Sequence, residues 1–349
     1  MKEYEGVGLT EEAHIGQAKR LARRFAKDLD FNEQQIAEID ILIKEIGTNA
    51  IKFARGTGQL YFTHSDPVWE PAGLEIVYTD KGPGMDDPSL ALEDGYTTTG
   101  TMGAGLGAIK RLADEFYIYS TPQSRTRPLQ LYGRTTHGTA MVIKKHLSPP
   151  DEPARAGREA WGVFTRALAG ESANGDAYVI NRDGSRRLVA VIDGLGHGHG
   201  AHEASARAAA VIEENAARPV ESILHATHEA LRSTRGAVAG LAAIDLVTGM
   251  IEYAGVGNTD FRVLGATSLR FVSLNGTLGS RLERVRVFKE RLPKVALIAM
   301  STDGISERWD PASYPGLAAL HPQLACAVVA RDHSRSNDDA TILFGRLSF

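Results

Sequence analysis

Acidic residues and glycines recur in two separate sets along this 349-residue chain, one set in each half. The first half carries EIGTNAIKF, DKGPGM and GAGLGA, at residues 45–53, 80–85 and 103–108. The second half carries NGD, DGLGHG, STDGI and NDDAT, at residues 174–176, 193–198, 301–305 and 337–341. The first set suits a site for ATP and its metal ion, and the second suits two metal ions that activate water against a phosphoester. The sequence therefore predicts two domains with opposite chemistry, one kinase-like and one phosphatase-like.

The overall charge and composition exclude several other classes of protein. A formal net charge of -4 gives no basic footprint for nucleic acid. The single cysteine, Cys326, cannot form a disulfide within the chain, so a reducing compartment is expected. The first residues contain no apolar stretch typical of a signal peptide, and no apolar run reaches the ~18 residues of a membrane span. We expect a soluble cytoplasmic protein that binds neither nucleic acid nor membrane.

A proline-rich polar segment, HLSPPDEPARAG, separates the two sets of motifs. Such composition is typical of a linker between domains. We therefore expect one domain at residues 1–146, a linker at 147–157 and a second domain at 158–349.

Hydrophobic periodicity predicts the elements of the first domain. Helices are expected at residues 10–29, 33–54 and 108–114, the second opened by the capping-box pair Asn32 and Gln35. Strands are expected at residues 59–64, 74–79, 116–120, 130–135 and 139–144. Together they predict an α/β sandwich in which helices cover one face of a mixed sheet.

The second domain has a different pattern, with many short strands and two helices. Strands are expected at residues 177–181, 188–193, 240–245, 250–255, 260–264, 296–301 and 340–346. Helices are expected at residues 203–217 and 220–234, and the segment LACAVVA around Cys326 is expected to be a buried core element. This pattern predicts packed sheets flanked by helices.

Glu45 and Asn49 lie four residues apart in an expected helix, so they share one face. The amide oxygen of Asn49 is a ligand of the kind that Mg²⁺ accepts while it bridges phosphates. Glu45 is placed to act as a general base near that ion. Lys52, about one turn further along, is placed to meet phosphate.

Asp80 ends an expected strand and is suited to accept a hydrogen bond from the exocyclic amine of adenine. Gly82 and Gly84 permit the tight turn that follows. Residues 97–107 are expected to form a flexible lid whose last glycines precede a helix and cradle phosphates, and Thr139 completes the predicted nucleotide-binding set. Each motif alone also fits a solvated helix face or a surface turn, but their joint order and spacing favour a nucleotide site.

These three motifs resemble those of the Bergerat-fold ATPases, the family of DNA gyrase, histidine kinases and anti-sigma-factor serine kinases. The resemblance is closest to the small RsbT-type serine kinases of bacterial partner switching and covers roughly residues 9–145. It implies a Bergerat-type α/β sandwich that uses ATP and Mg²⁺. It also implies a base at Glu45, a Mg²⁺ ligand at Asn49, an adenine contact at Asp80, and phosphate-loop glycines at Gly103, Gly105 and Gly107.

In the second half, Asp176, Asp193, Asp303 and Asp338 each lie beside an expected strand. Carboxylates at strand ends can converge from distant sequence positions, and hard oxygen ligands favour Mg²⁺ or Mn²⁺ over zinc. Gly194 lets its carbonyl approach a metal ion without interference from a side chain. A zinc site built from the neighbouring histidines His197, His199 and His202 is a less favoured alternative, because no compact ligand quartet accompanies them.

The four segments, in this order, resemble the protein phosphatase 2C superfamily, in its bacterial SpoIIE and RsbX branch, over about residues 158–347. The resemblance implies an α-β-β-α sandwich with two Mn²⁺ or Mg²⁺ ions. It implies a bridging ligand at Asp193, a carbonyl ligand at Gly194, a ligand of one ion at Asp176, and ligands of the other at Asp303 and Asp338, with Asp339 able to exchange roles with Asp338.

Together these resemblances predict a bifunctional regulator of a partner-switching or stressosome-type pathway. Its first half would phosphorylate, and its second half dephosphorylate, serine or threonine of STAS-domain proteins. One alternative is an ATP-responsive docking module that sequesters a partner, joined to a single catalytic phosphatase. A second is a phosphatase that ATP regulates, with no kinase output.

Overall fold

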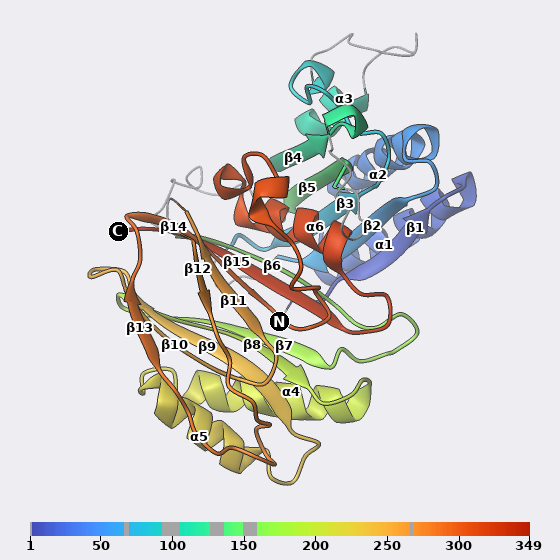
Figure 1. The fold of residues 1–349 in the computed structure, drawn as a ribbon. Helices are drawn as coiled ribbons and strands as arrows, with labels where there is room; N and C mark the ends of the chain where they lie inside the picture. Colours follow the sequence, from blue (N-terminus) through green and yellow to red (C-terminus); the bar gives the residue numbers. More distant parts are fainter. Residues whose placement is uncertain (1, 66–69, 93–104, 126–135, 149–158, 266–267) are drawn as a thin grey trace. The chain divides into compact units, whose positions relative to one another are not determined.

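The computed structural model describes residues 2–65, 70–92, 105–125, 136–148, 159–265 and 268–349 (Figure 1). The chain divides into two compact units. One comprises Lys2–Arg155 with Ala327–Asp332, and the other Ala156–Cys326 with His333–Phe349. Most of the expected linker lies outside the described residues, as does the strand expected at 130–135.

The N-terminal unit contains a five-stranded sheet with the order β1-β2-β3-β5-β4. Its strands are β1 (Glu5–Leu9), β2 (Gly58–His64), β3 (Gly73–Thr79), β5 (Gly138–His146) and β4 (Glu115–Thr121). Every neighbouring pair is antiparallel, so the expectation of a mixed sheet was wrong. The reason is the last strand of the unit, β5, which inserts between β3 and β4 and runs antiparallel to both.

Two long helices, α1 (Glu12–Asp28) and α2 (Glu33–Phe53), and the short α3 (Gly105–Leu112) belong to the same unit. The capping box that opens α2 is formed as expected. The side chain of Asn32 accepts a hydrogen bond from the Gln35 N–H at 2.9 Å, and the Gln35 side chain accepts from the Asn32 N–H at 3.1 Å. Two of the N–H groups that a helix start leaves without helical partners are thereby satisfied.

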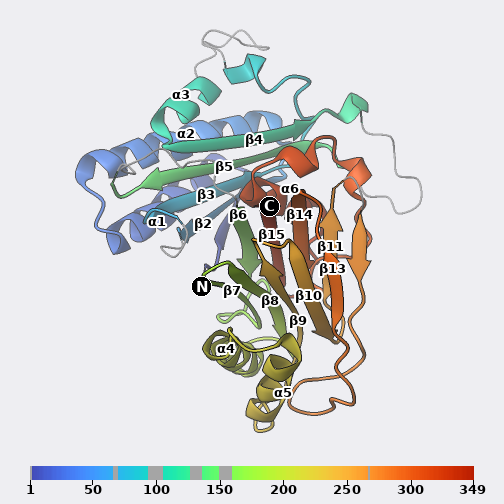
Figure 2. The same ribbon diagram turned by 90° about the vertical axis from the view of Figure 1, so that its left-hand side faces the viewer.

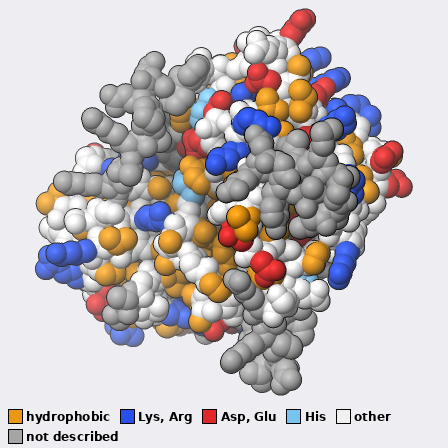
Figure 3. Space-filling view, turned by 90° about the horizontal axis from the view of Figure 1, so that it is seen from above, with side chains coloured by type: hydrophobic (Ala, Val, Ile, Leu, Met, Phe, Trp, Pro, Cys, Tyr) orange, Lys and Arg blue, Asp and Glu red, His pale blue; other side chains and the backbone are white. Residues whose placement is uncertain are grey.

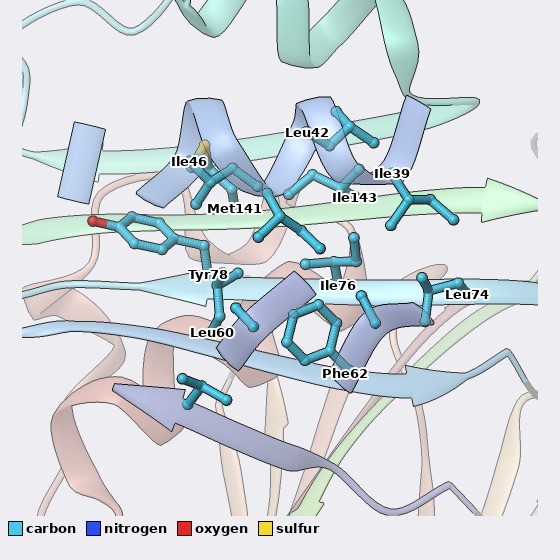
Figure 4. Close-up of a cluster of buried hydrophobic side chains, with 14 of the residues drawn as sticks. Ile39, Leu42, Ile46, Leu60, Phe62, Leu74, Ile76, Tyr78, Met141 and Ile143 are labelled. Carbon is cyan, nitrogen blue, oxygen red and sulfur yellow. The ribbon is translucent and has the colours of Figure 1, made fainter. Parts of the chain in front are cut away.

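The core of this unit lies between one face of the sheet and the helices. Figure 4 shows Ile39, Leu42 and Ile46 of α2 directed toward apolar side chains of the sheet. These sheet residues are Leu60, Phe62, Leu74, Ile76, Tyr78, Met141 and Ile143. Apolar residues recur every three or four positions in α2 and every second position in the strands. Each period places its apolar side chains on one face, and the two faces meet in one core layer.

The C-terminal unit contains two five-stranded sheets, each antiparallel throughout. The first contains β7 (Asp176–Asp183), β8 (Arg186–Gly194), β9 (Ala237–Asp245), β10 (Met250–Val256) and β13 (Phe288–Arg291). The second contains β6 (Glu159–Arg166), β11 (Asp260–Leu264), β12 (Leu269–Phe271), β14 (Val295–Ser301) and β15 (Ala340–Ser348). Helices α4 (His199–Glu214) and α5 (Val220–Ala230) pack against the first sheet, as Figure 2 shows.

A third helix, α6 (Pro322–His333), is divided between the two units, and its first residues, up to Cys326, belong to the C-terminal unit and bond to the second sheet. The side chain of Gln323 bonds both the N–H and the carbonyl of Val163 in β6, each at 2.9 Å. The sequence predicted a buried core element here but not a helix. The run from Leu324 to Ala330 is buried on every side, so it lacks the polar face by which a surface helix is recognised.

Charged side chains of both signs are interspersed over the face shown in Figure 3. Among the described residues on that face there is no continuous basic field of the kind that binds nucleic acid. No helix in the described part of the chain combines the length and the apolar character that crossing a bilayer requires.

Two isoleucines of α2 provide a matched test of the core. Ile46 is fully buried, whereas Ile41 is 47% exposed on the same helix. We expect Ile46→Ala to destabilise the N-terminal unit by about 2–5 kcal/mol, because it leaves a cavity as well as removing buried methyl groups. Ile41→Ala should cost within about 0.5 kcal/mol. Peptide-resolved hydrogen exchange of α2 measures both, and equal loss of protection would contradict this placement of the core.

Candidate functional sites

The predicted catalytic face of α2 meets the first residue of α3. A Cβ built on Gly105 would lie 3.1 Å from Asn49 Nδ2 and 3.5 Å from Glu45 Oε2. The structure therefore brings these three predicted residues together, and Gly105 leaves the space between the backbone and the two side chains. Lys52 lies exposed in the last turn of α2.

The glycine motif is partly helical rather than wholly a loop. The described part of helix α3 already includes Gly105, three residues before the predicted start, so Gly105 and Gly107 are helical. Gly103 and residues 97–104 of the lid expected at 97–107 lie outside the described residues.

Asp80 is buried and held by backbone groups. Its Oδ1 accepts from the N–H of Gly82 at 2.7 Å and from the N–H of Thr139 at 3.2 Å. Its own N–H donates to the Thr139 carbonyl at 2.8 Å. Burial, followed by the charge and hydrogen bond of Asp80, raises the pKa of Tyr78, which keeps that phenol neutral. Asp80 is thus a fixed carboxylate at the end of β3.

Glycines allow the close backbone approaches around Asp80. A Cβ on Gly82 would lie 2.7 Å from the Phe53 carbonyl oxygen at the end of α2. Gly84 and Gly138 have φ values of 68° and 117°, which favour glycine. Sequence reasoning missed Gly138, whose Cβ would clash with the Asp80 carbonyl oxygen. Its signal was the turn His137-Gly138, which was assigned to a hairpin and not to the site.

In the C-terminal unit, the predicted aspartates gather at strand ends. Asp176 opens β7 and pairs in register with Asp193 near the end of β8. Asp303 follows β14, and Asp338 and Asp339 precede β15, its antiparallel neighbour. Antiparallel neighbours bring the end of one strand beside the start of the next, which explains the convergence of distant sequence segments.

These carboxylates act on one another electrostatically. Burial and then the charge of Asp193 raise the pKa of Asp176 well above its ordinary value. Burial, followed by the charges of Asp303, Asp338 and Asp339, raises the pKa of Asp193 to about 7. The pKa of Asp338 is raised by burial and by Asp303. Carboxylates that disfavour one another's ionisation are stabilised in their charged form by a bound cation.

The donor set fits a hard divalent ion rather than zinc. It consists of carboxylate oxygens, which suit Mg²⁺ or Mn²⁺. Within the described residues no three His, Cys, Asp or Glu side chains already stand close enough to hold an ion, so the carboxylates interact without forming a closed cage. The zinc alternative gains no support: His197 Nδ1 lies 2.6 Å from Glu171 Oε1, and His202 Nδ1 lies 2.9 Å from the Asn174 carbonyl oxygen.

Asp338 and Asp339 differ in their surroundings. Asp339 is buried, and its two oxygens accept from the N–H groups of Leu168 at 2.7 Å and Gly175 at 3.0 Å. Its N–H donates to Asp338 Oδ1 at 3.0 Å. Asp338 is the less buried carboxylate and interacts with Asp303. The geometry therefore favours Asp338 over Asp339 as the more open oxygen donor.

Neutral side chains that sequence reasoning missed hold the acidic residues in place. The hydroxyl of Thr302 donates to Asp176 Oδ2 at 2.7 Å, and Asn258 Nδ2 donates to Asp303 Oδ2 at 2.7 Å. Thr302 stands inside the STDGI motif and so carried a local signal, whereas Asn258 is distant in sequence and carried none. A Cβ on Gly194 would clash with the Ala201 carbonyl oxygen, which adds a packing reason for that glycine.

Comparison with known proteins matches the two halves of the chain to different families. The family model described as "Histidine kinase-like ATPase domain" matches residues 9–127, and the one described as "Stage II sporulation protein E (SpoIIE)" matches residues 183–347. The serine/threonine-protein kinase RsbT of Bacillus subtilis (strain 168) is 37% identical over 120 residues, which make up 34% of this chain and 89% of RsbT.

Two further similarities each cover about half of the chain. The phosphoserine phosphatase RsbX of Bacillus subtilis (strain 168) is 28% identical over 188 residues, which make up 53% of this chain and 94% of RsbX. A chain in the solved structure "The bacterial stressosome: a modular system that has been adapted to control secondary messenger signaling" aligns with a TM-score of 0.52 and 31% identity. This alignment covers 54% of the present chain and 99% of the other.

The raised pKa of Asp193 predicts a pH effect on the metal-free protein. The folded chain binds a proton at Asp193 with a pKa of about 7, against an ordinary value of 3.8, so the folded state holds more protons than the unfolded state between these values. Its contribution to the free energy of unfolding is therefore highest at the acid end and is lost as pH rises to about 7.

Thermal melting in EDTA, followed by intrinsic fluorescence to which Trp161 and Trp309 contribute, measures this effect. The melting temperature of Asp193→Asn minus that of the wild type should increase from about pH 5 to about pH 7.5, because asparagine does not ionise. Parallel profiles for the two proteins would contradict the electrostatic description of the site.

Proposed function

We propose that this chain, which belongs to the histidine kinase-like ATPases in its N-terminal half and to the SpoIIE-type phosphatases in its C-terminal half, both adds and removes phosphate on serine or threonine of partner-switching proteins. The observation that supports the proposal is twofold: Glu45 and Asn49 lie near Gly105 in one unit, and the predicted aspartates lie at the ends of paired strands in the other. The similarity to RsbT and to RsbX supports the two opposite activities.

In the kinase half, we assign the Mg²⁺ ligand to Asn49 and the base to Glu45. Bound Mg²⁺ would neutralise charge on the ATP phosphates. Glu45 would accept the proton of the protein hydroxyl as it attacks the γ-phosphate, and the burial and fixed bonds of Asp80 suit an acceptor for the adenine amine. Gly105, with Gly103 and Gly107, would give the phosphates access to backbone N–H groups.

Four other residues would assist nucleotide binding in the proposed site. Lys52 would meet phosphate from the last turn of α2. Gly82 and Gly84 would shape the turn after Asp80, and Thr139 would hold that carboxylate through its N–H.

In the phosphatase half, two Mn²⁺ or Mg²⁺ ions would supply an activated water and a clamp for the phosphate. We assign Asp193 as the ligand shared by both ions, with the carbonyl of Gly194 beside it. Asp176 would serve one ion, and Asp303 and Asp338 the other. Asp339 would chiefly hold the loops of Leu168 and Gly175 in place.

The partners we propose are STAS-domain proteins, in their phosphorylated and unphosphorylated forms, within a stressosome-type assembly in the cytoplasm. This rests on the kinship with the Rsb proteins and on the similarity to a chain from the solved stressosome structure. The proposed site chemistry is compatible with a protein hydroxyl and its phosphoester, and the partner would provide the surrounding sequence.

A kinase assay tests the N-terminal half. Glu45→Ala should lower the rate of radiolabelled phosphate transfer from ATP to a STAS protein by roughly 10²–10⁴, because the base acts in the transition state. ATP affinity, measured by calorimetry, should change little. Lys44→Ala is the matched control, since Lys44 is the exposed neighbour on the same helix. Undiminished transfer by the Glu45 variant would refute the base role, and no transfer by the wild type would favour the docking-module alternative.

A phosphatase assay tests the C-terminal half. With Mn²⁺ or Mg²⁺ the wild type should hydrolyse a phosphoserine protein, and chelation should stop it, because the water is activated by metal. Asp193→Asn should abolish turnover while the protein stays folded. Asp183→Asn, at the exposed far end of β7, is the control and should retain activity. Full activity in EDTA, or a requirement for zinc, would overturn the assignment.

A further inference from the structure

Arg235 lies at the end of the sheet that carries the acidic cluster. Ala237, the first residue of β9, pairs in register with Gly194, the last residue of β8 and the neighbour of Asp193. Arg235 precedes this pair by two residues. Its backbone therefore emerges at the same sheet end as the proposed bridging carboxylate.

The side chain of Arg235 crosses the glycine-rich loop that follows Asp193. A Cβ on Gly200 would lie 2.5 Å from Arg235 Nε, and a Cβ on Gly196 would lie 3.3 Å from Nη1. Nη1 also donates to the His197 carbonyl at 3.4 Å. Gly200 does not have a positive φ, so its backbone conformation does not require glycine. The space that the guanidinium occupies supplies the reason for a glycine at that position.

Glu171 holds the same loop from another direction. Its Oε1 lies 2.6 Å from His197 Nδ1, and a Cβ on Gly198 would lie 2.8 Å from its Oε2. The loop is thus fixed between a carboxylate and a guanidinium. Arg235 therefore contacts a loop that Glu171 also holds.

Arg235 has no carboxylate partner among the described residues, and it is exposed. Arg232, three residues earlier, differs in this respect because it pairs with Glu229 at 2.6 Å. Arg335, on the other side of the cluster, lowers the pKa of Asp338 and so already interacts with a carboxylate there. Within the described part of the chain, the Nε and Nη2 groups of Arg235 have no hydrogen-bond acceptor, so they remain available for an anion.

We propose that Arg235 binds the phosphate group of the phosphoserine or phosphothreonine substrate beside Asp193. A guanidinium presents parallel N–H donors that match two phosphate oxygens. Arg235, which lies against the glycine-rich loop, would donate hydrogen bonds to the phosphate oxygens that the metal ions do not contact. The inference deepens the phosphatase function proposed above and rests on it.

The test compares Arg235→Ala and Arg235→Lys with the control Arg232→Ala in the full chain with Mn²⁺. The measured quantities are KM and kcat for a phosphoserine peptide and the Ki of inorganic phosphate as a competitive inhibitor. Arg235→Ala should raise KM and Ki about tenfold or more, because charge-assisted hydrogen bonds are lost. The lysine variant should recover part of the loss, and the control should match the wild type. A merely structural role would lower the melting temperature without raising Ki.

Values of KM and Ki within about twofold of the wild type for folded Arg235→Ala would overturn the inference and leave the phosphatase assignment standing. If the wild type hydrolyses no phosphoserine substrate, the proposed phosphatase function fails separately. Calorimetric titration of inorganic phosphate with Mn²⁺ then decides the role of Arg235. Weaker binding to Arg235→Ala than to Arg232→Ala supports it, and equal binding refutes it.

Discussion

The carboxylates of several aspartates lie close together at the ends of neighbouring strands, and their mutual repulsion determines the properties of the C-terminal site. Asp176 and Asp193 face each other in register, and each raises the free energy of ionising the cluster. Such an arrangement lowers the stability of the bare fold at neutral pH, so packing alone does not explain it. A divalent cation reverses the sign of the interaction. The sheets hold these carboxylates together. Their closeness accounts both for the lower stability of the metal-free fold and for the proposed binding of metal ions.

The N-terminal unit uses a buried aspartate in the opposite way. Asp80 accepts hydrogen bonds from two backbone N–H groups, which fix the position of its carboxylate. Its position then depends on Gly138, which lets the next strand pass close to its backbone. One carboxylate is thus a fixed acceptor, whereas Asp193 belongs to a cluster that repels itself. Asp80 and Asp193 are the same residue type, so it is their neighbouring groups that give them different environments.

Several helices and strands could be predicted from the sequence because interactions between residues close along the chain determine them. The cap at Asn32, the apolar face of α2 and the alternation in β3 agree with one another, so the helix and the strand were predicted to within a residue or two. Motif spacing likewise identified the aspartates that converge at the ends of the strands.

What the sequence did not show depends on partners that are distant along the chain. Strand β1 has two glycines in five residues and is an edge strand, so its pattern is weak. The antiparallel pairing of β5 depends on which strands it joins, and periodicity does not report that. The difference between Asp338 and Asp339 is set by the N–H groups of other loops. Adjacent identical residues cannot be separated without those contacts.

Joining the two proposed activities in one chain has a consequence that separate proteins would not share. Every kinase site is made together with one phosphatase site, so relative expression cannot set the balance between phosphorylation and dephosphorylation. Covalent linkage also raises the effective concentration of each site near a partner bound by the other. The steady level of phosphate on a shared partner then depends on rate constants and on site occupancy. Since the proposed kinase site would use ATP with its metal and the other site is a self-repelling carboxylate cluster, the concentrations of nucleotide and of free divalent ion would act on the two sites unequally.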